Sequence, residues 1–168
     1  GNRALFEGLA AETRWDWSQR HPVVRISFGG GGLTSAERLE QRIFEILDDN
    51  ERRLGVVCRH RSVGGRFVEL IERAHAQHGA PVVVLIDEYD KPILDSIEDR
   101  ALATVMREGL KALYGMLKDA DAHLKFVFMT GVTKFSKVSL FSGLNNLLDL
   151  TLDPQYSALC GYTDQDVD

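Results

Sequence analysis

The sequence predicts an α/β domain with a mostly parallel sheet flanked by helices. Strand-like segments alternate along the chain with segments of helical periodicity, which is the order expected of βα units. The run Val82–Ile86 is continuously apolar, and a strand without alternation is typical of a parallel sheet that is buried on both faces. A length of 168 residues, 44% of them apolar, fits a single domain over residues 1–168.

The first half of the chain contains one strand and two helices. Residues 22–28 are apolar and β-branched, and the glycines of residues 29–32 end this strand. Thr34 and Glu37 have the spacing of a capping box, which predicts a helix start. The buried face of that helix is expected to hold Leu39, Ile43, Ile46 and Leu47. After a basic stretch, a second helix is predicted by the helical spacing of Phe67, Leu70, Ile71 and Ala74. Gly79 is its expected C-cap.

The second half contains two further strands around one long helix. The strand after Pro81 ends in Asp87-Glu88, and residues 124–130 form a second apolar strand that ends before Gly131. Residues 147–152 alternate and predict a strand at the sheet edge. The inner stripe of the long helix is expected to consist of Leu102, Val105, Met106, Leu110, Leu113 and Leu117.

Charge and cysteine content narrow the function classes. The net charge of −5 argues against a domain that coats nucleic acid. Cys58 and Cys160 have no C-x-x-C spacing, which indicates a reducing cytoplasm rather than a disulfide framework. A membrane span is not expected, because it needs about 20 apolar residues. The chain begins Gly1-Asn2-Arg3 without Met or a signal peptide, and we interpret it as a tag remnant followed by a cytoplasmic piece of a longer protein.

Asp87 and Glu88 are the strongest candidates for chemistry. Ligands of open parallel sheets bind beyond the carboxyl ends of the strands. An apolar strand that leads into Asp-Glu is the Walker B arrangement of ATPases, in which Asp holds Mg²⁺ through water and Glu orients the attacking water. We therefore predict Asp87 as the metal residue and Glu88 as a catalytic residue, against the alternative of a solvated acidic loop.

Polar residues that follow the next strand are the second candidates. Thr130 stands at the strand tip, where P-loop ATPases commonly place a sensor of the γ-phosphate, although Thr130-Gly131 also fits a simple turn. Lys134, Lys137 and Asn145 are predicted to contact the cofactor, with surface lysines and a turn-forming Asn as the alternative.

A phosphate cradle is missing from the sequence. No run has the pattern G-x-x-x-x-G-K-[ST], in which backbone N–H groups and a Lys hold the phosphates of ATP. The glycines of residues 29–32 lie between a strand and a helix, but neither Lys-Ser nor Lys-Thr follows them. We interpret them as a flexible connection.

Other residue groups give weaker signals. His75 and His78 have helical spacing for a shared metal but lack a third ligand. Cys58 and His60 suggest a nucleophile and base without an orienting acid. A basic loop could bind phosphate and contains Arg59, Arg61 and Arg66. An acidic centre has the composition of a metal nuclease site but the wrong spacing, and consists of Asp87, Glu88, Asp90 and Lys91.

Longer motifs resemble the AAA-ATPase-like family of prokaryotes. The most extensive are residues 85–93 and 128–147, and shorter ones are Leu5–Leu9, His21–Val23 and Leu159–Thr163. The resemblance implies a P-loop NTPase-like fold of the AAA/ASCE type that lacks its P-loop strand. It also implies Asp87 as the Mg²⁺ carboxylate, Glu88 as the water-activating residue and Thr130 as the sensor-like position.

The same resemblance implies partners. In that family a Walker A loop precedes the segment similar to Leu5–Leu9, and a PD-(D/E)XK nuclease-like domain commonly follows. We therefore expect ATP and Mg²⁺ to be used by the intact protein, and this fragment to be inactive and to bind neither. We expect contacts with the upstream P-loop segment and the downstream nuclease-like domain, no membrane, and nucleic acid only through the parent protein.

The missing strand has a structural consequence. In this class of ATPase the P-loop strand lies beside the sensor strand, so its absence leaves an unpaired sheet edge. We expect either the last strand to rearrange or a second copy to pair there. The alternative to an ATPase is a regulatory or interaction module without hydrolysis that is coupled to the nuclease-like domain.

Overall fold

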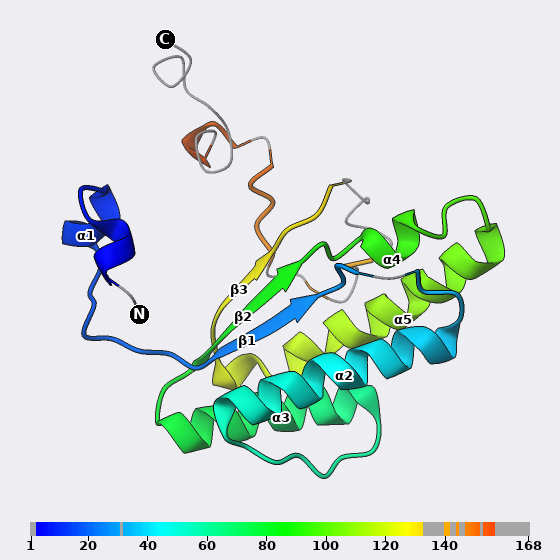
Figure 1. The fold of residues 1–168 in the computed structure, drawn as a ribbon, viewed down its shortest axis with the longest axis horizontal. Coiled ribbons are helices and arrows are strands. Elements are labelled where there is room, and N and C mark those ends of the chain that lie inside the picture. Colours follow the sequence, from blue (N-terminus) through cyan, green and yellow to red (C-terminus); the bar gives the residue numbers. More distant parts are fainter. Residues whose placement is uncertain are drawn as a thin grey trace.

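Three parallel strands form the centre of the computed structural model, which describes residues 3–30, 32–132, 140, 141, 144, 147–151 and 153–156. The strands are β1 (Val23–Ser27), β2 (Val82–Asp87) and β3 (Leu124–Met129), and their order in the sheet is β1-β2-β3 (Figure 1). Ser27 is opposite Asp87, and Ile86 is opposite Met129. The predicted α/β class with a parallel sheet is confirmed.

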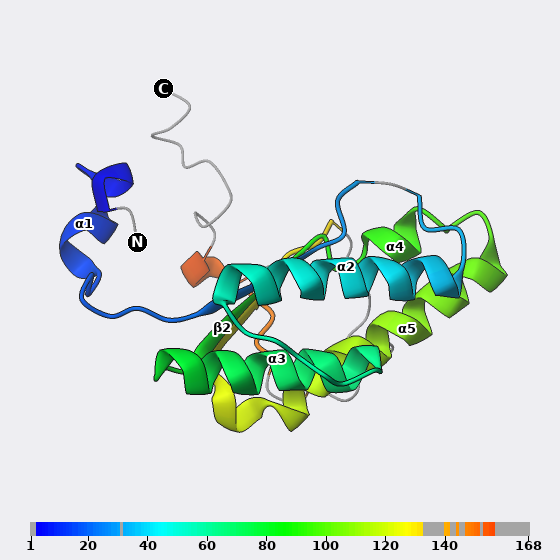
Figure 2. The same cartoon turned by 60° about the horizontal axis from the view of Figure 1, so that its bottom comes forward.

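Three long helices pack against one face of this sheet. They are α2 (Ala36–Leu54), α3 (Val63–His78) and α5 (Arg100–Asp119), and all three contact one another in a single layer (Figures 1 and 2). The short helix α4 (Lys91–Leu94) follows β2 near its carboxyl end. The remaining short elements are η1 (Arg3–Phe6), α1 (Ala10–Arg14), η2 (Asp121–His123) and η3 (Pro154–Tyr156).

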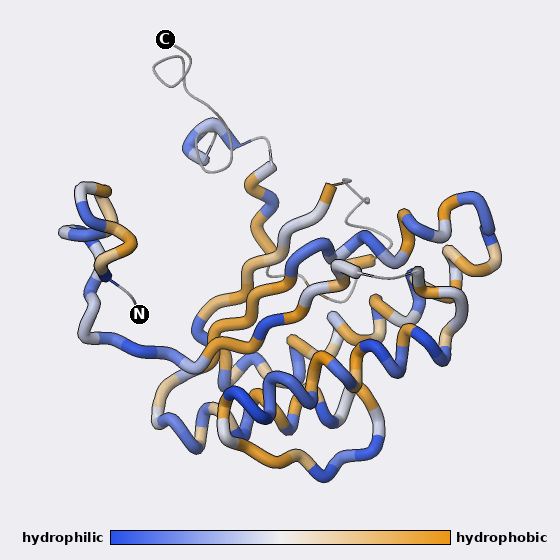
Figure 3. Tube along the Cα trace, viewed as in Figure 1, coloured by the Kyte–Doolittle hydropathy of each residue, from blue (hydrophilic) through white to orange (hydrophobic). Residues whose placement is uncertain are grey.

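The core lies between the sheet and the helix layer. Alternate strand residues are buried, among them Val24, Val84 and Ile86. The strands are mostly apolar, with a hydrophilic interruption in β1 (Figure 3). On the opposite face of the sheet Val83 and Leu85 are only half-buried, and Phe126 of β3 is 55% exposed. The described helices thus cover one face, which corrects the expectation that β2 and β3 are buried on both.

The helix boundaries correct one predicted cap and confirm another. α2 begins after Ser35, whose hydroxyl accepts the N–H of Arg38 at 3.3 Å, so Thr34 is not the N-cap. Gly79 ends α3 in the left-handed conformation with φ 63°, as predicted. The predicted buried faces of α2 and α3 are confirmed.

The inner face of α5 and the last predicted strand also differ from expectation. Val105 is 41% exposed, whereas Tyr114 is fully buried, because the buried stripe runs through Met106, Leu110, Leu113 and Leu117. Residues 147–151 contain no strand, and a turn follows in which the N–H of Asp153 donates to the carbonyl of Leu150. The predicted edge strand at 147–152 is therefore wrong over its described residues.

Side chains of α2 close the outer edge of β1. The amide of Asn50 accepts the N–H of Arg25 at 2.8 Å and donates to the carbonyl of Arg25 at 2.7 Å. Arg53 donates to the carbonyl of Val23 at 2.7 Å. Because these groups are occupied, β1 does not offer a free edge for another strand.

One negative finding concerns membranes. Within the described part of the chain, no helix has both the length and the apolar character needed to cross a bilayer.

Candidate functional site

The candidate site lies where the three strands end. Because the strands are parallel, their carboxyl ends meet at one edge of the sheet (Figure 1). Ser27 and Asp87 are the last residues of β1 and β2, and Thr130 directly follows β3. The structure therefore brings the predicted residues Asp87 and Thr130 together, and it adds Ser27, which the same rule of strand ends could have identified.

Asp87 and Thr130 are directly joined. The Thr130 hydroxyl donates to Oδ1 of Asp87 at 2.6 Å. The backbone fixes this arrangement, since the N–H of Thr130 donates to the carbonyl of Ile86 at 2.8 Å and the Thr130 carbonyl accepts the N–H of Tyr89 at 3.0 Å. Asp87 is exposed, so its carboxylate is accessible to solvent and to a hydrated cation.

Glu88 directly follows Asp87 and has an unusual backbone conformation. Its φ of 54° is the only positive value among the described residues other than glycine. Its carboxylate reaches the loop after β1, where a Cβ on Gly29 would lie 3.1 Å from Oε2 of Glu88 and 3.5 Å from Oγ of Ser27. The left-handed conformation costs roughly 1–2 kcal/mol for a residue with a side chain. Such strain concentrates at functional sites, and here it occurs at the residue that follows the strand-end carboxylate Asp87.

The site fits a hydrated cation better than a fully coordinated one. No three or more His, Cys, Asp or Glu side chains converge as a metal cluster within the described residues. Mg²⁺ does not need such a cluster, because it keeps several waters and binds one or two carboxylates. Asp87, exposed and beside a hydroxyl, matches that requirement.

The described part of the chain does not include the predicted cofactor contacts. Lys134, Lys137 and Asn145 lie outside the described residues, so their role stays a prediction. In the glycine-rich loop the N–H of Gly29 donates back to Oγ of Ser27 at 3.4 Å.

The nuclease-like centre does not form. Asp90 is fully buried and its Oδ2 accepts the N–H of Val132 at 3.0 Å, whereas Lys91 pairs with Asp95 at 3.0 Å. Asp87, by contrast, is exposed and bound to Thr130. The acidic residues of this segment therefore point to different partners.

The Cys58–His60 pair is not a nucleophile and base. Burial, and then the charges of Glu51 and Glu69, raise the pKa of the Cys58 thiol to about 12, so the thiolate is scarce near neutral pH. His60 Nδ1 lies 3.2 Å from Oγ of Ser62.

The other weak candidates have structural partners. His75 lies against His123, with 3.0 Å between their Nδ1 atoms, and His78 contacts the carbonyl of Leu54. Arg66 binds Glu51 at 2.6 Å, where the interaction joins α2 to α3.

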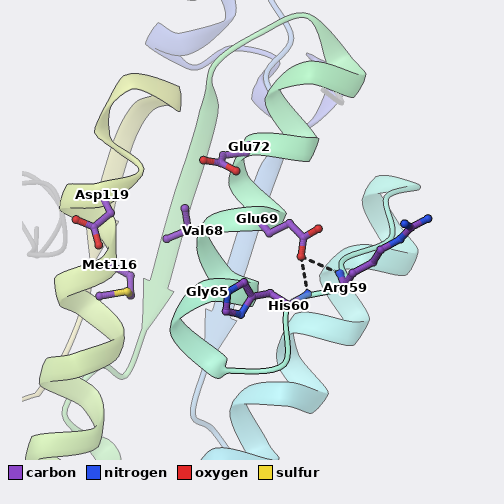
Figure 4. Close-up of a pocket in the computed structure, with 8 residues that line it drawn as sticks. All are labelled: Arg59, His60, Gly65, Val68, Glu69, Glu72, Met116 and Asp119. Carbon is purple, nitrogen blue, oxygen red and sulfur yellow. Dashed lines mark hydrogen bonds between the residues drawn. The ribbon is translucent and has the colours of Figure 1, made fainter.

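A surface depression lies away from the strand ends. It measures about 630 Å³ and is lined by residues of α3, α5 and the loop before α3 (Figure 4). On its wall Glu69 accepts the backbone N–H groups of Arg59 and His60 at 2.7 and 2.8 Å. These hydrogen bonds, together with Arg73, lower the pKa of Glu69 to about 2. The carboxylate thus holds the loop before α3 against that helix.

Comparisons with known proteins concern the family of the chain. A family model described as "Predicted AAA-ATPase" matches residues 1–141. The chain is 58% identical over 168 residues to an "Uncharacterized protein in vnfD 5'region" of Azotobacter chroococcum mcd 1. That match covers 100% of this chain but 33% of the relative, so the chain spans about a third of the relative's length. No solved structure matches.

Proposed function

The chain belongs to the predicted AAA-ATPase family, and from this membership we propose that it forms the Walker B and sensor part of an Mg²⁺-dependent ATPase. The observation that carries the proposal is the 2.6 Å hydrogen bond between Thr130 and Asp87 at neighbouring strand ends. Glu88, adjacent in sequence, provides a second carboxylate, which reaches the loop after β1 near Gly29.

Each of the three residues has a distinct role in this proposal. Asp87 holds the hydrated cation, which suits an exposed carboxylate. When bound, Mg²⁺ neutralises charge on phosphate oxygens. Glu88 orients the attacking water, and Thr130 offers a hydroxyl at the sensor position while it holds Asp87 in place.

The phosphates require another part of the protein. This sequence has no G-x-x-x-x-G-K-[ST] run, so it lacks the backbone cradle and the Lys that hold ATP. The chain spans only 33% of its relative. We propose that the upstream segment of the same, longer protein brings the Walker A loop and that a nuclease-like domain lies downstream.

The edge of β3 is the proposed docking place of that upstream segment. β3 is an edge strand of the described sheet, and α2 already occupies the outer edge of β1 through Asn50 and Arg53. Phe126 of β3 is 55% exposed and would be covered by a neighbouring strand and its helix. The occupant we propose is the P-loop strand, and a second copy of the chain is the competing outcome.

The test is ATP hydrolysis by the intact protein with Glu88 replaced by Gln. We expect hydrolysis to fall by at least about 100-fold, since general-base and water-positioning groups contribute roughly 10²–10⁴. Binding of ATP is expected to stay within about threefold, because Glu88 does not hold the phosphates in this proposal. The matched control is Glu98→Gln, an exposed carboxylate beyond α4.

Two results would contradict the proposal in different ways. Unchanged turnover in Glu88→Gln would remove the catalytic assignment. No hydrolysis by the intact wild-type protein would favour the alternative, a regulatory or interaction module coupled to the nuclease-like domain.

A further inference from the structure

Asp90 is the most deeply buried carboxylate of the described residues. It has no exposed surface, although it stands three residues after the exposed Asp87. Its Oδ2 accepts the backbone N–H of Val132 at 3.0 Å. A buried carboxylate is costly unless it is well hydrogen-bonded, so this contact joins the loop after β2 firmly to the loop after β3.

Gly131 lies directly on this carboxylate. A Cβ at position 131 would lie 2.8 Å from Oδ1 of Asp90 and 2.5 Å from Cε1 of the Tyr89 ring. Real Cβ contacts are essentially never shorter than 3.0 Å, so position 131 admits only glycine without a shift. The backbone that follows Thr130 thus packs closely against Tyr89 and Asp90.

The backbone of residues 89 and 90 is itself anchored. The backbone carbonyl of Asp90 accepts the N–H groups of Ile93 and Leu94, which start α4. The buried Tyr114 of α5 donates from its hydroxyl to the carbonyl of Tyr89 at 2.9 Å. Burial, and then the charge of Asp90, raise the pKa of Tyr114, which keeps this phenol protonated as a donor.

We propose that Asp90 is a positioning residue that fixes the Thr130 hydroxyl against Asp87 by holding Gly131 and Val132. The inference rests on the function proposed above, because it assigns to Asp90 control over the geometry of that same site. Asp90 acts from the buried side of the loop and does not touch the nucleotide or the cation. Loss of its carboxylate frees the segment after Thr130 and weakens the contact with Asp87.

The experiment compares ATP hydrolysis by the intact protein and four variants. They are Asp90→Ala, Asp90→Asn, Thr130→Val and the double variant Asp90→Ala/Thr130→Val. Asn retains an oxygen that can accept the Val132 N–H, so it is the conservative rescue. Ser96→Ala is the matched control, because Ser96 is also buried, at 3% exposure, and its hydroxyl donates to the carbonyl of Pro92 instead.

The expected results separate positioning from general destabilisation. Asp90→Ala lowers kcat by about tenfold, the effect of losing roughly one charge-assisted hydrogen bond, with KM for ATP within about threefold. Asp90→Asn recovers most of the rate, and Ser96→Ala stays within about twofold of wild type. The double variant is no slower than Thr130→Val, because two residues that act through one contact are not additive.

A second variant covers the case in which Asp90→Ala does not fold. Gly131→Ala leaves Asp90 intact but forces the loop off Tyr89 and Asp90, so we expect the same loss of kcat. Its control is Gly115→Ala in α5, where a Cβ meets no atom within 4 Å.

The results also distinguish this inference from the proposed function. If Thr130→Val loses activity while Asp90→Ala and Gly131→Ala keep it, the positioning role is wrong and the ATPase assignment stands. Additive losses in the double variant, or a loss in Ser96→Ala equal to that in Asp90→Ala, would also overturn it. If the intact wild-type protein hydrolyses no ATP, the proposed function fails, and the positioning role fails with it.

Discussion

Replacement of Asn50 by Ala tests whether side chains of α2 occupy the outer edge of β1 and so end the sheet there. Asn50 is 3% exposed, and its side-chain amide acts like the backbone of a neighbouring strand toward Arg25. The substitution removes both hydrogen bonds to Arg25, a third bond to the carbonyl of Ile46 within α2, and a fourth that Oδ1 of Asn50 accepts from Arg53. It leaves an N–H and a carbonyl of β1 without the partner that α2 provides.

The expected cost follows from these bonds. At about 1 kcal/mol each, the two bonds to Arg25 contribute about 2 kcal/mol to the free energy of unfolding. The bond to Ile46 adds little, because that carbonyl belongs to the helix ladder already. The bond from Arg53 also adds little, because the same Arg53 nitrogen keeps its bond to the carbonyl of Val23. Ala is a better helix former than Asn by roughly 0.5 kcal/mol, so we expect a net loss of about 1.5 kcal/mol. With a urea slope of about 2 kcal/mol per M, the unfolding midpoint falls by about 0.7 M.

Urea unfolding followed by circular dichroism measures this loss, and sedimentation velocity at several concentrations measures self-association through the opened edge. Asp49→Ala is the matched control, because Asp49 is the adjacent residue of α2 and its side chain is 67% exposed. We expect the control to stay within about 0.5 kcal/mol of wild type. If Asn50→Ala and Asp49→Ala unfold at the same urea concentration, the hydrogen bonds of the Asn50 amide to the edge of β1 do not stabilise the protein.

Two further predictions concern stability. Gly115→Ala should raise the free energy of unfolding by about 0.5–1 kcal/mol, since a helix interior favours Ala, and thermal unfolding measures the gain. Gly109→Ala in the same helix should not stabilise, because its Cβ would lie 2.8 Å from Cδ2 of the buried Leu39, and an equal gain in both variants would refute the packing of α2 on α5. Hydrogen bonds lower the pKa of Glu69 from 4.5 to about 2, so the folded state favours the ionised carboxylate. We therefore expect wild type to be more stable than Glu69→Gln above about pH 4.5, and this advantage to shrink as the pH falls toward 2. Urea midpoints measured across that range check it, and a difference independent of pH would contradict the role of the ionised carboxylate.

Local patterns were sufficient to predict most elements. The unbroken apolar run before Asp87 predicted β2, and the helical spacing of the apolar residues predicted the buried faces of α2 and α3. The site followed from one physical rule, because polar residues at the ends of parallel strands must lie at the same edge. That rule predicts Asp87 and Thr130 at the same edge of the sheet, and the strand order makes them neighbours.

Long-range contacts explain what the sequence did not reveal. Tyr114 lies four residues after Leu110 on the buried stripe of α5. Its hydroxyl donates to the carbonyl of Tyr89, 25 residues earlier, and helical spacing does not encode this contact. Alternation at 147–152 is typical of a strand, but a strand also needs a neighbour with which to pair, and the described part of this segment has none. Asp90 looked like a member of an acidic surface cluster, and its burial against Val132 depends on the chain's path after β3.

The measurement that tests the central claim most directly is the Mg²⁺ dependence of ATP hydrolysis by the intact protein with Asp87 replaced by Asn. If Asp87 holds the hydrated cation, the Mg²⁺ concentration that gives half-maximal hydrolysis rises by at least about tenfold, because a neutral amide replaces the charged ligand. Asp95→Asn, which alters an exposed carboxylate paired with Lys91, should leave that concentration unchanged. The same Mg²⁺ dependence in Asp87→Asn as in wild type would contradict the assignment of this sheet edge as the catalytic site.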